Sequence, residues 1–315
     1  MTKPLKPVNL HLNSVTLTDI ENCKLIKTKE LSRDLANLRK FTADTNENNF
    51  SGNPFLYHYQ FKNLLKCRRR DGKTIYDIAQ DQEAWDKLIE QTKLRNRGGR
   101  SAAANVFECF RINLGSVVMF KASTAKYLYK KYNARSVLDP TAGWGGRMLG
   151  AWALDIDYTG IDTNIEMKQS YDDMIAFLDE ETGFDNSIFS VEKTNELKMI
   201  WSSCLDVDFS QLNYDFVLTS PPYVNLEIYE HMEEWENDKA FYEDFFIPLW
   251  QKCVDHIQPR GKVCFNISPK MYADAVKHGL TPCDDEEDLL QQMGQKVVAL
   301  TKGKKKQDKI YIWNC

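Results

Sequence analysis

From about residue 111 to the end of the chain, short apolar stretches alternate with amphipathic segments, and this alternation constrains the fold more than any other feature. Strands that are separated by helices form a mostly parallel sheet with helices on both faces. We therefore expect an α/β fold with a seven-stranded, mostly parallel sheet. The apolar stretches predict strands at Ser136–Leu138, Tyr158–Ile161, Met199–Trp201, Phe216–Leu218, Lys262–Asn266, Val297–Thr301 and Ile310–Trp313. The helices are expected at Ser123–Tyr132, Arg147–Leu154, Glu166–Leu178 and Phe241–Ile257.

The last two predicted strands differ from the others in the segment that connects them. Only Lys302 to Asp308 lies between them, which is too short for a helix that crosses over the sheet. Strands with so short a connection pair antiparallel. A C-terminal antiparallel hairpin is therefore expected at the end of the sheet.

The first 110 residues follow a different pattern. Helical periodicity covers Leu31–Lys40, Tyr57–Leu65 and Ile75–Leu94, and a basic, glycine-containing segment follows at 95–100. We expect residues 1–110 to form a basic, mostly helical module and residues 111–315 to form the α/β domain.

Charge is distributed unevenly along the chain. Residues 1–135 carry 25 Lys and Arg against 13 Asp and Glu, whereas residues 136–315 carry 16 against 32. Such asymmetry is typical of chains in which one part faces nucleic acid, although two solvated surfaces of opposite sign give the same counts. Lys and Arg bind phosphates without reading sequence, so basic clusters predict affinity rather than specificity. The clustered basic residues are Lys66, Arg68, Arg69, Arg70, Arg95, Arg97 and Arg100, for each of which a solvated helix face is the alternative interpretation.

Cysteine spacing and hydropathy exclude several classes of protein. The 8 cysteines are scattered without Cys-x-x-Cys pairs, so we expect no zinc site and reduced thiols. No apolar run reaches the roughly 18 residues that span a bilayer, and the N-terminus lacks the apolar core of a secretory signal. We therefore expect no membrane partner and an intracellular location, in the cytoplasm, in a nucleoid or nucleus, or in a host cell if the protein is viral.

A glycine-rich turn follows the first predicted strand of the α/β domain. The segment Asp139 to Gly146 joins this strand to a helix, and its glycines allow the backbone to approach a ligand closely. It matches neither Gly-x-Gly-x-x-Gly nor a P-loop, and a tight turn that only packs helix on strand is the alternative. The next strand ends at Asp162, where a carboxylate can accept hydrogen bonds from ribose hydroxyls.

A second segment carries a chemical signal of its own. The predicted strand Phe216–Leu218 runs into Ser220-Pro221-Pro222-Tyr223, and two consecutive prolines can continue neither a sheet ladder nor a helix. They instead form a rigid loop at the carboxyl end of the strand, which is the edge at which open α/β sheets bind ligands.

Together the two segments resemble the motifs of S-adenosylmethionine (AdoMet)-dependent DNA amino-methyltransferases, over roughly residues 115–315. The resemblance implies a Rossmann-like methyltransferase fold with AdoMet as the cofactor and DNA as the partner. It implies that the turn holds the methionine and sugar of AdoMet and that an upstream segment, in which Ala122 replaces the usual proline, also binds it. The implied cofactor residues are Phe120, Thr124, Asp139, Pro140, Thr141, Gly143, Gly145, Asp162 and, for the adenine amino group, Asp206, with Asp208 as its competitor.

The same resemblance assigns the catalytic site to Ser220, Pro221, Pro222 and Tyr223. An exocyclic amine is a poor nucleophile, and two acceptors on its N–H bonds stabilise the charge that develops on the nitrogen. The Ser220 hydroxyl and the Pro221 carbonyl can supply them, while Tyr223 stacks on a base that has left the duplex. The loop has no cysteine, so carbon-5 methylation of cytosine is excluded.

The target base and the nucleic acid stay open at this point. A leading serine is typical of cytosine-N4 enzymes, which slightly favours cytosine over adenine N6, but many such enzymes carry the motifs in the opposite order. An RNA methyltransferase acting on guanine N2 or adenine N6 is the second hypothesis. A catalytically silent nucleic-acid-binding subunit with the same fold is the third.

Overall fold

The computed structural model describes residues 11–44, 49–69, 72–95, 99–115, 119–183, 195–223, 227–228, 235–288 and 308–315. The chain divides into two compact units, each formed by several segments. The first unit contains residues 1–27, 57–118 and 225–230. The second contains residues 28–56, 119–224 and 231–315. This division differs from a single boundary after residue 110.

The second unit contains a seven-stranded sheet, as the sequence predicts. The strand order is β4-β3-β2-β5-β7-β9-β8. The first five are mutually parallel, and β9 runs antiparallel to both of its neighbours. The mostly parallel, Rossmann-like α/β fold is therefore confirmed. The strands are β2 (Ser136–Asp139), β3 (Asp157–Asp162), β4 (Leu197–Trp201), β5 (Phe216–Thr219), β7 (Lys262–Ile267), β8 (Asp285–Glu287) and β9 (Lys309–Asn314).

The edge of the sheet beside β9 differs from the expectation. The strand predicted at Val297–Thr301 lies outside the described residues, and the antiparallel partner that the structure shows for β9 is β8. The sequence of β8 is Asp-Glu-Glu. Because all three residues are charged, a search for apolar stretches does not find this strand. Only Glu287 of the three is buried, where its carboxylate accepts hydrogen bonds from Lys131 and Tyr132.

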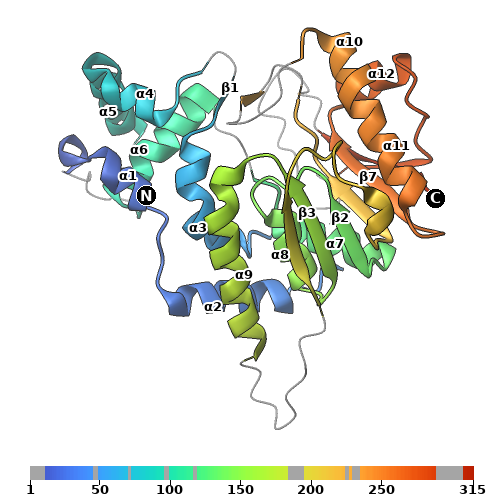
Figure 1. Ribbon diagram of the computed structural model, residues 1–315. Coiled ribbons are helices and arrows are strands. Elements are labelled where there is room, and N and C mark those ends of the chain that lie inside the picture. The colour runs from blue at the N-terminus through green and yellow to red at the C-terminus, as the bar shows by residue number, and fades with distance from the viewer. Residues whose placement is uncertain are drawn as a thin grey trace, which may run out of the picture. The chain divides into compact units, whose positions relative to one another are not determined.

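Helices lie on both faces of the sheet (Figure 1), and neighbouring residues of β5 face different helices. Phe216 packs edge-on against Tyr129 of α7, whereas Val217 belongs to the apolar cluster under α11. This period of two is what a strand that is buried on both faces requires. The flanking elements are α7 (Ala122–Tyr132), α8 (Gly146–Trp152), η3 (Ile165–Met167), α9 (Lys168–Gly183), η4 (Phe209–Gln211), α10 (Asp238–Ala240), η5 (Phe241–Phe246), α11 (Ile247–His256) and α12 (Pro269–Lys277).

Residues 28–56 join the second unit because polar groups anchor them there. Helix α2 (Thr28–Lys40) ends against α7, where the Lys126 ammonium donates to the carbonyls of Leu38 and Arg39 at 2.8 and 2.7 Å. The end of a helix leaves carbonyls without partners, and a cation satisfies them well. The Asp34 carboxylate in turn accepts from the amides of Gly52 and Phe55 and so fixes the start of α3 (Asn53–Leu65).

The first unit is mostly helical. Its described elements are η1 (Leu12–Ser14), α1 (Leu17–Asn22), the part of α3 from Tyr57 onward, β1 (Arg68–Arg69), α4 (Ile75–Gln80), α5 (Gln82–Arg95), α6 (Ala102–Phe110), η2 (Arg111–Gly115) and β6 (Glu227–Ile228). The expected helix at Ile75–Leu94 is two helices, because Asp81 adopts an extended conformation and caps α5 through the Ala84 amide. Strand β6 pairs antiparallel with β1.

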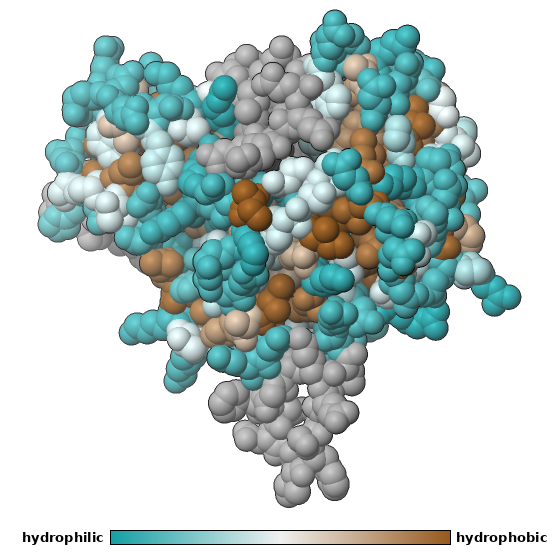
Figure 2. All heavy atoms as spheres, in the orientation of Figure 1, coloured by the Kyte–Doolittle hydropathy of each residue, from teal (hydrophilic) through white to brown (hydrophobic). Residues whose placement is uncertain are grey.

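The visible surface is mostly hydrophilic, with apolar side chains in small groups (Figure 2). The large apolar side chains that are exposed are far apart in sequence, at Leu25, Phe50, Leu94, Ile112 and Ile165. Among the described residues, no helix has the length and hydropathy needed to cross a membrane.

Candidate active site

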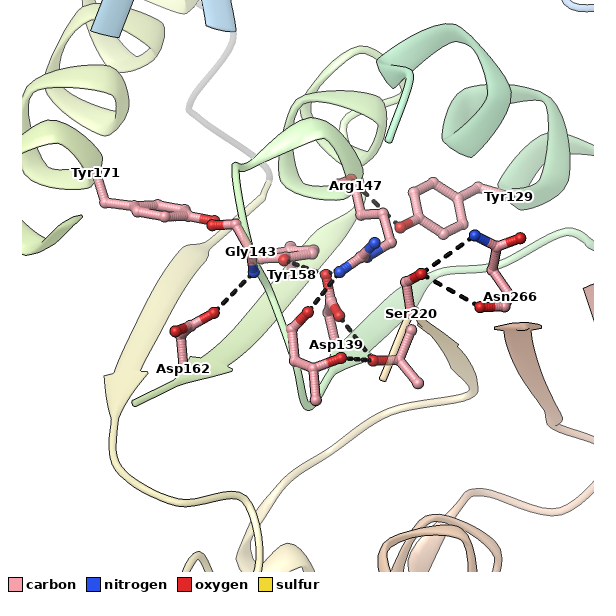
Figure 3. Close-up of polar contacts among 11 residues, drawn as sticks. Tyr129, Asp139, Gly143, Arg147, Tyr158, Asp162, Tyr171, Ser220 and Asn266 are labelled. Carbon is pink, nitrogen blue, oxygen red and sulfur yellow. Dashed lines mark hydrogen bonds and ion pairs between the residues drawn. The ribbon is translucent and has the colours of Figure 1, made fainter. Parts of the chain in front are cut away.

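The carboxyl ends of the parallel strands β2, β3, β5 and β7 lie at one edge of the sheet, and the two sequence motifs follow two of them. The glycine-rich turn begins after β2 and leads into α8, while Ser220 directly follows β5. Because β2 and β5 are neighbours in the sheet, segments 81 positions apart in the chain meet (Figure 3).

The turn requires glycine at several positions. Gly143 and Gly145 have φ of +59° and +84°, in the left-handed region that L-residues with a side chain rarely adopt. A Cβ at Gly146 would lie 1.9 Å from the carbonyl oxygen of Phe120. The backbone of the upstream segment and that of the turn therefore touch.

Asp139, at the end of β2, is completely buried and bonded only within the protein. Its Oδ2 accepts from Arg147 Nε at 2.6 Å and from the Tyr158 hydroxyl at 2.7 Å, and its Oδ1 accepts from Thr219 Oγ1 at 3.2 Å (Figure 3). Its side chain is 0% exposed. The carboxylate thus supports the turn from beneath through these three hydrogen bonds.

Arg147 was not among the residues that the sequence singled out. Besides Asp139, its guanidinium donates through Nη2 to the Thr141 carbonyl at 2.5 Å and lies 5.3 Å from the centre of the Phe120 ring. Burial favours the neutral guanidinium, but the adjacent Asp139 carboxylate outweighs it and raises the pKa of Arg147. Arg147 stays charged and ties the turn to β2 and to the upstream segment.

Asp162, at the end of β3, faces the turn from the other side. Its Oδ2 accepts from the Gly143 amide at 2.8 Å and its Oδ1 from the Asn164 amide at 2.9 Å. The Tyr171 hydroxyl donates to the Gly143 carbonyl at 2.8 Å, so Gly143 is held on both sides. Each Asp162 oxygen keeps a lone pair for a further donor, as two adjacent hydroxyls would supply.

Burial raises the pKa of Asp162, because desolvation outweighs the two amide hydrogen bonds that stabilise the carboxylate. The ionised form is the one that accepts two further hydrogen bonds. We therefore predict that AdoMet binds with constant affinity above this pKa and loses up to tenfold in affinity per pH unit below it. Isothermal titration from neutral pH down to the lowest pH at which the protein stays folded measures this, and Asp162→Asn should bind weakly with a flat profile. The same slope in the variant would show that another group titrates.

The remaining implied cofactor residues occupy different environments. Phe120 lies beside the turn, Thr124 is buried inside α7, and Pro140 and Thr141 lie in the turn itself. Asp206 and Asp208 are both exposed beyond β4. The Asp208 carboxylate caps η4 by accepting from the Ser210 amide and hydroxyl at 3.0 and 2.7 Å, whereas no described residue donates to the carboxylate of Asp206. Of the two, Asp206 retains acceptors for a ligand.

Ser220 is held by the neighbouring strand. Its hydroxyl donates to the main-chain carbonyl of Asn266 at 3.2 Å and accepts from Asn266 Nδ2 at 3.1 Å. Pro221 is buried, and Tyr223 is partly buried against the apolar cluster under α11. Sequence reasoning missed Asn266, which is the fifth residue of an otherwise ordinary apolar strand.

Thr219 connects the two motifs. Its hydroxyl donates to Asp139 and lies 2.6 Å from the hydroxyl of Thr141. Since the Thr219 hydrogen is directed to the carboxylate, Thr141 donates to Thr219. The residue before Ser220 is thus bonded to the glycine-rich turn, and the distance between the two motifs is fixed.

The basic residues that the sequence singled out belong to the first unit. Lys66 and Arg68 are partly buried, and Arg95 and Arg100 are exposed, the latter in an ion pair of 3.7 Å with Glu108. Arg69 is described only through its backbone in β1, and Arg70 and Arg97 lie outside the described residues.

No model of a known protein family and no curated protein sequence matches the chain. Similar solved structures include an RNA methyltransferase from Salinibacter ruber with S-adenosyl-L-homocysteine (12% identity, TM-score 0.35, covering 62% of this chain and 93% of that one). An rRNA methylase from Streptococcus thermophilus is also similar (8%, 0.37, 62% and 96%). A third is the glycopeptide N-methyltransferase MtfA with S-adenosyl-L-homocysteine (14%, 0.32, 55% of this chain), of whose length this chain covers only 56%.

Proposed function

We propose that this protein is an AdoMet-dependent methyltransferase that methylates an exocyclic amino group of a base in DNA, with cytosine N4 slightly favoured over adenine N6. The observation that carries the proposal is the meeting of the two motifs. Thr219, which directly precedes Ser220, forms hydrogen bonds with Asp139 and Thr141 of the glycine-rich turn. The Ser220 hydroxyl, an acceptor for an amine, therefore stands at a fixed distance from a site for a nucleoside cofactor.

The residues at the edge of the sheet fit AdoMet. The Asp162 carboxylate has acceptor capacity left for the two ribose hydroxyls. Gly143 and Gly145 have no side chain, so a ligand can approach the backbone at these two positions. Asp206, exposed beyond β4, supplies an acceptor for an adenine amino group. Bound there, AdoMet supplies an electrophilic methyl group on a sulfonium ion.

Ser220 and Pro221 perform the chemistry that this chain contributes. The amine that attacks the methyl group gains positive charge, and the Ser220 hydroxyl oxygen and the Pro221 carbonyl accept hydrogen bonds from its two N–H groups. The new C–N bond would replace the C–S bond of the sulfonium, so that S-adenosyl-L-homocysteine would leave as a thioether and the surplus proton of the amine would pass to water. The second proline keeps that carbonyl in position, and Tyr223 provides an aromatic face for the target base. Orientation of the amine toward the methyl group supplies much of the acceleration.

The assignment to DNA rests on the serine that leads the catalytic motif and on the charge of the first part of the chain. Residues 1–135 carry an excess of Lys and Arg, and the first unit holds Lys66, Arg68, Arg95 and Arg100. Such side chains neutralise phosphates and give an affinity that falls steeply with salt.

Charge reversal in the basic cluster tests this part of the proposal. We expect Arg68→Glu, Arg69→Glu and Arg70→Glu together to weaken DNA binding at least tenfold and to flatten the dependence of log Kd on log salt concentration, because fewer counterions are released. Fluorescence anisotropy at several salt concentrations measures both. The control is a variant with the same three-charge reversal in the second unit, at Lys168, Lys239 and Lys270. These lysines form ion pairs on the surface. Equal losses in both variants would show a nonspecific effect of net charge.

The proposed activity is tested by incubating the protein with AdoMet that carries a radiolabelled methyl group and with unmethylated DNA. Digestion to nucleosides and mass spectrometry then identify the product. We expect label in N4-methylcytosine or N6-methyladenine. Label in RNA but not in DNA would favour the RNA methyltransferase hypothesis instead. Intact AdoMet binding without any methyl transfer would favour a catalytically silent subunit.

A further inference from the structure

We propose that Asn266 is a positioning residue that holds the Ser220 hydroxyl as a hydrogen-bond acceptor for the substrate amine, an inference that rests on the proposed function. The register of the sheet brings the two residues together. Thr219 of β5 pairs with Phe265 of β7, so the residues that follow them, Ser220 and Asn266, lie side by side. Figure 3 shows the Asn266 amide nitrogen directed at the Ser220 hydroxyl.

The hydrogen bonds of the Ser220 hydroxyl leave one place for a substrate. A hydroxyl group has one hydrogen and two lone pairs. The hydrogen is donated to the Asn266 main-chain carbonyl at 3.2 Å, and one lone pair accepts from Asn266 Nδ2 at 3.1 Å. No residue in the described part of the chain donates to the other lone pair, which can only accept. An amine N–H is the partner that it suits.

This arrangement solves a difficulty that is specific to serine. A carboxylate in the same position has no hydrogen and always accepts, whereas a free hydroxyl can rotate and direct its hydrogen at the amine lone pair that must attack the methyl group. Such a hydrogen bond would withdraw the nucleophilic electrons. Asn266 prevents this rotation by occupying both the hydrogen and one lone pair of the hydroxyl.

The other half of the Asn266 amide supports a role in the site. Among the described residues, its buried Oδ1 has no hydrogen-bond partner, which is unfavourable and uncommon for a side-chain amide inside a folded protein. The donor end of the amide is thus used on Ser220, and the acceptor end meets no donor among those residues.

Two substitutions test the inference. Asn266→Ala removes the Nδ2 donor, so we expect kcat to fall about tenfold, the equivalent of one well-oriented hydrogen bond. KM for DNA and Kd for AdoMet should stay within twofold of the wild type, because the residue orients a group that acts in the transition state. Asn314→Ala, at the exposed end of neighbouring β9, is the matched control and should retain full activity.

A double-mutant cycle separates positioning from a general structural effect. In a Ser220→Ala background, followed by single-turnover transfer of the radiolabelled methyl group, Asn266→Ala should have no further effect because there is no hydroxyl left to hold. An equal loss in both backgrounds, or a wild-type kcat in the single variant, would overturn the inference. Failure of the wild-type protein to methylate any nucleic acid would instead remove the proposed function itself.

Asn266→Asp provides an isosteric variant if the alanine variant folds poorly. The introduced carboxyl group can donate to Ser220 only when it is protonated. The ratio of variant to wild-type kcat should therefore rise as the pH falls through the pKa of this group. A ratio that does not depend on pH, or that rises with increasing pH, contradicts the assignment.

Discussion

Replacing Ser220 with alanine should lower kcat about a hundredfold and leave Kd for AdoMet within twofold of the wild type. The substitution removes one of the two acceptors on the attacking amine, and loss of one preorganised electrostatic partner typically costs a factor of roughly 10² to 10³. The cofactor site should stay intact, because the Thr219 bonds to Asp139 and Thr141 do not involve Ser220.

Single-turnover transfer of a radiolabelled methyl group measures the rate, and isothermal titration measures AdoMet binding. Ser210→Ala is a suitable control, since Ser210 is an exposed serine whose hydroxyl bonds, among the described residues, to Asp208 and Gln211 only. A parallel loss of AdoMet affinity and rate in the Ser220 variant would contradict the role given to this hydroxyl, because it would place Ser220 in the cofactor site.

The parts of the fold that could be predicted from sequence are those with local signals. Each central strand is a short apolar run beside turn residues, and the glycine-rich turn shows itself because Gly143 and Gly145 have conformations that other residues rarely adopt. The Ser-Pro-Pro-Tyr segment lies at the carboxyl end of β5 for the same kind of reason, since prolines end a ladder.

The parts that could not be predicted depend on partners distant in sequence. Residues 28–56 belong to the second unit because Lys126, about 90 positions later, caps α2. Strand β8 is polar and forms through its pairing with β9. The role of Asn266 follows from the register between β5 and β7, and no property of the strand alone distinguishes it from a surface asparagine.

Arg147 illustrates the same limit at the centre of the site. An arginine in the first turn of a helix is unremarkable in sequence and even opposes the helix dipole. Only the fold shows that it reaches Asp139, whose buried carboxylate needs a cation, and that the pair binds the Thr141 carbonyl. The structure thus shows Asp139 supporting the turn through hydrogen bonds from Arg147, Tyr158 and Thr219.

Replacing Arg147 with methionine should therefore destabilise the protein by about 3–5 kcal/mol, because the substitution leaves the Asp139 carboxylate buried without its counter-charge. Arg147 and Asp139 side chains are 5% and 0% exposed, so solvent cannot take over the role of the cation. Urea denaturation followed by circular dichroism measures the loss. Arg135→Met is the matched control, since the Arg135–Asp215 pair has a similar geometry at 2.9 Å but an arginine that is 80% exposed. We expect Arg135→Met to destabilise the protein by less than about 1 kcal/mol.

Removing both charges distinguishes an unpaired buried carboxylate from a loss of packing. In the Asp139→Asn, Arg147→Met double variant, no ionised group remains to be buried, so part of the stability lost in the Arg147 variant should return. AdoMet affinity should not return with it, because the Thr141 carbonyl still lacks the guanidinium that holds the turn. Recovery of both the stability and the AdoMet affinity would mean that the charge pair, and not the geometry of the turn, decides cofactor binding. Recovery of neither would assign the effect of Arg147 to packing against Phe120.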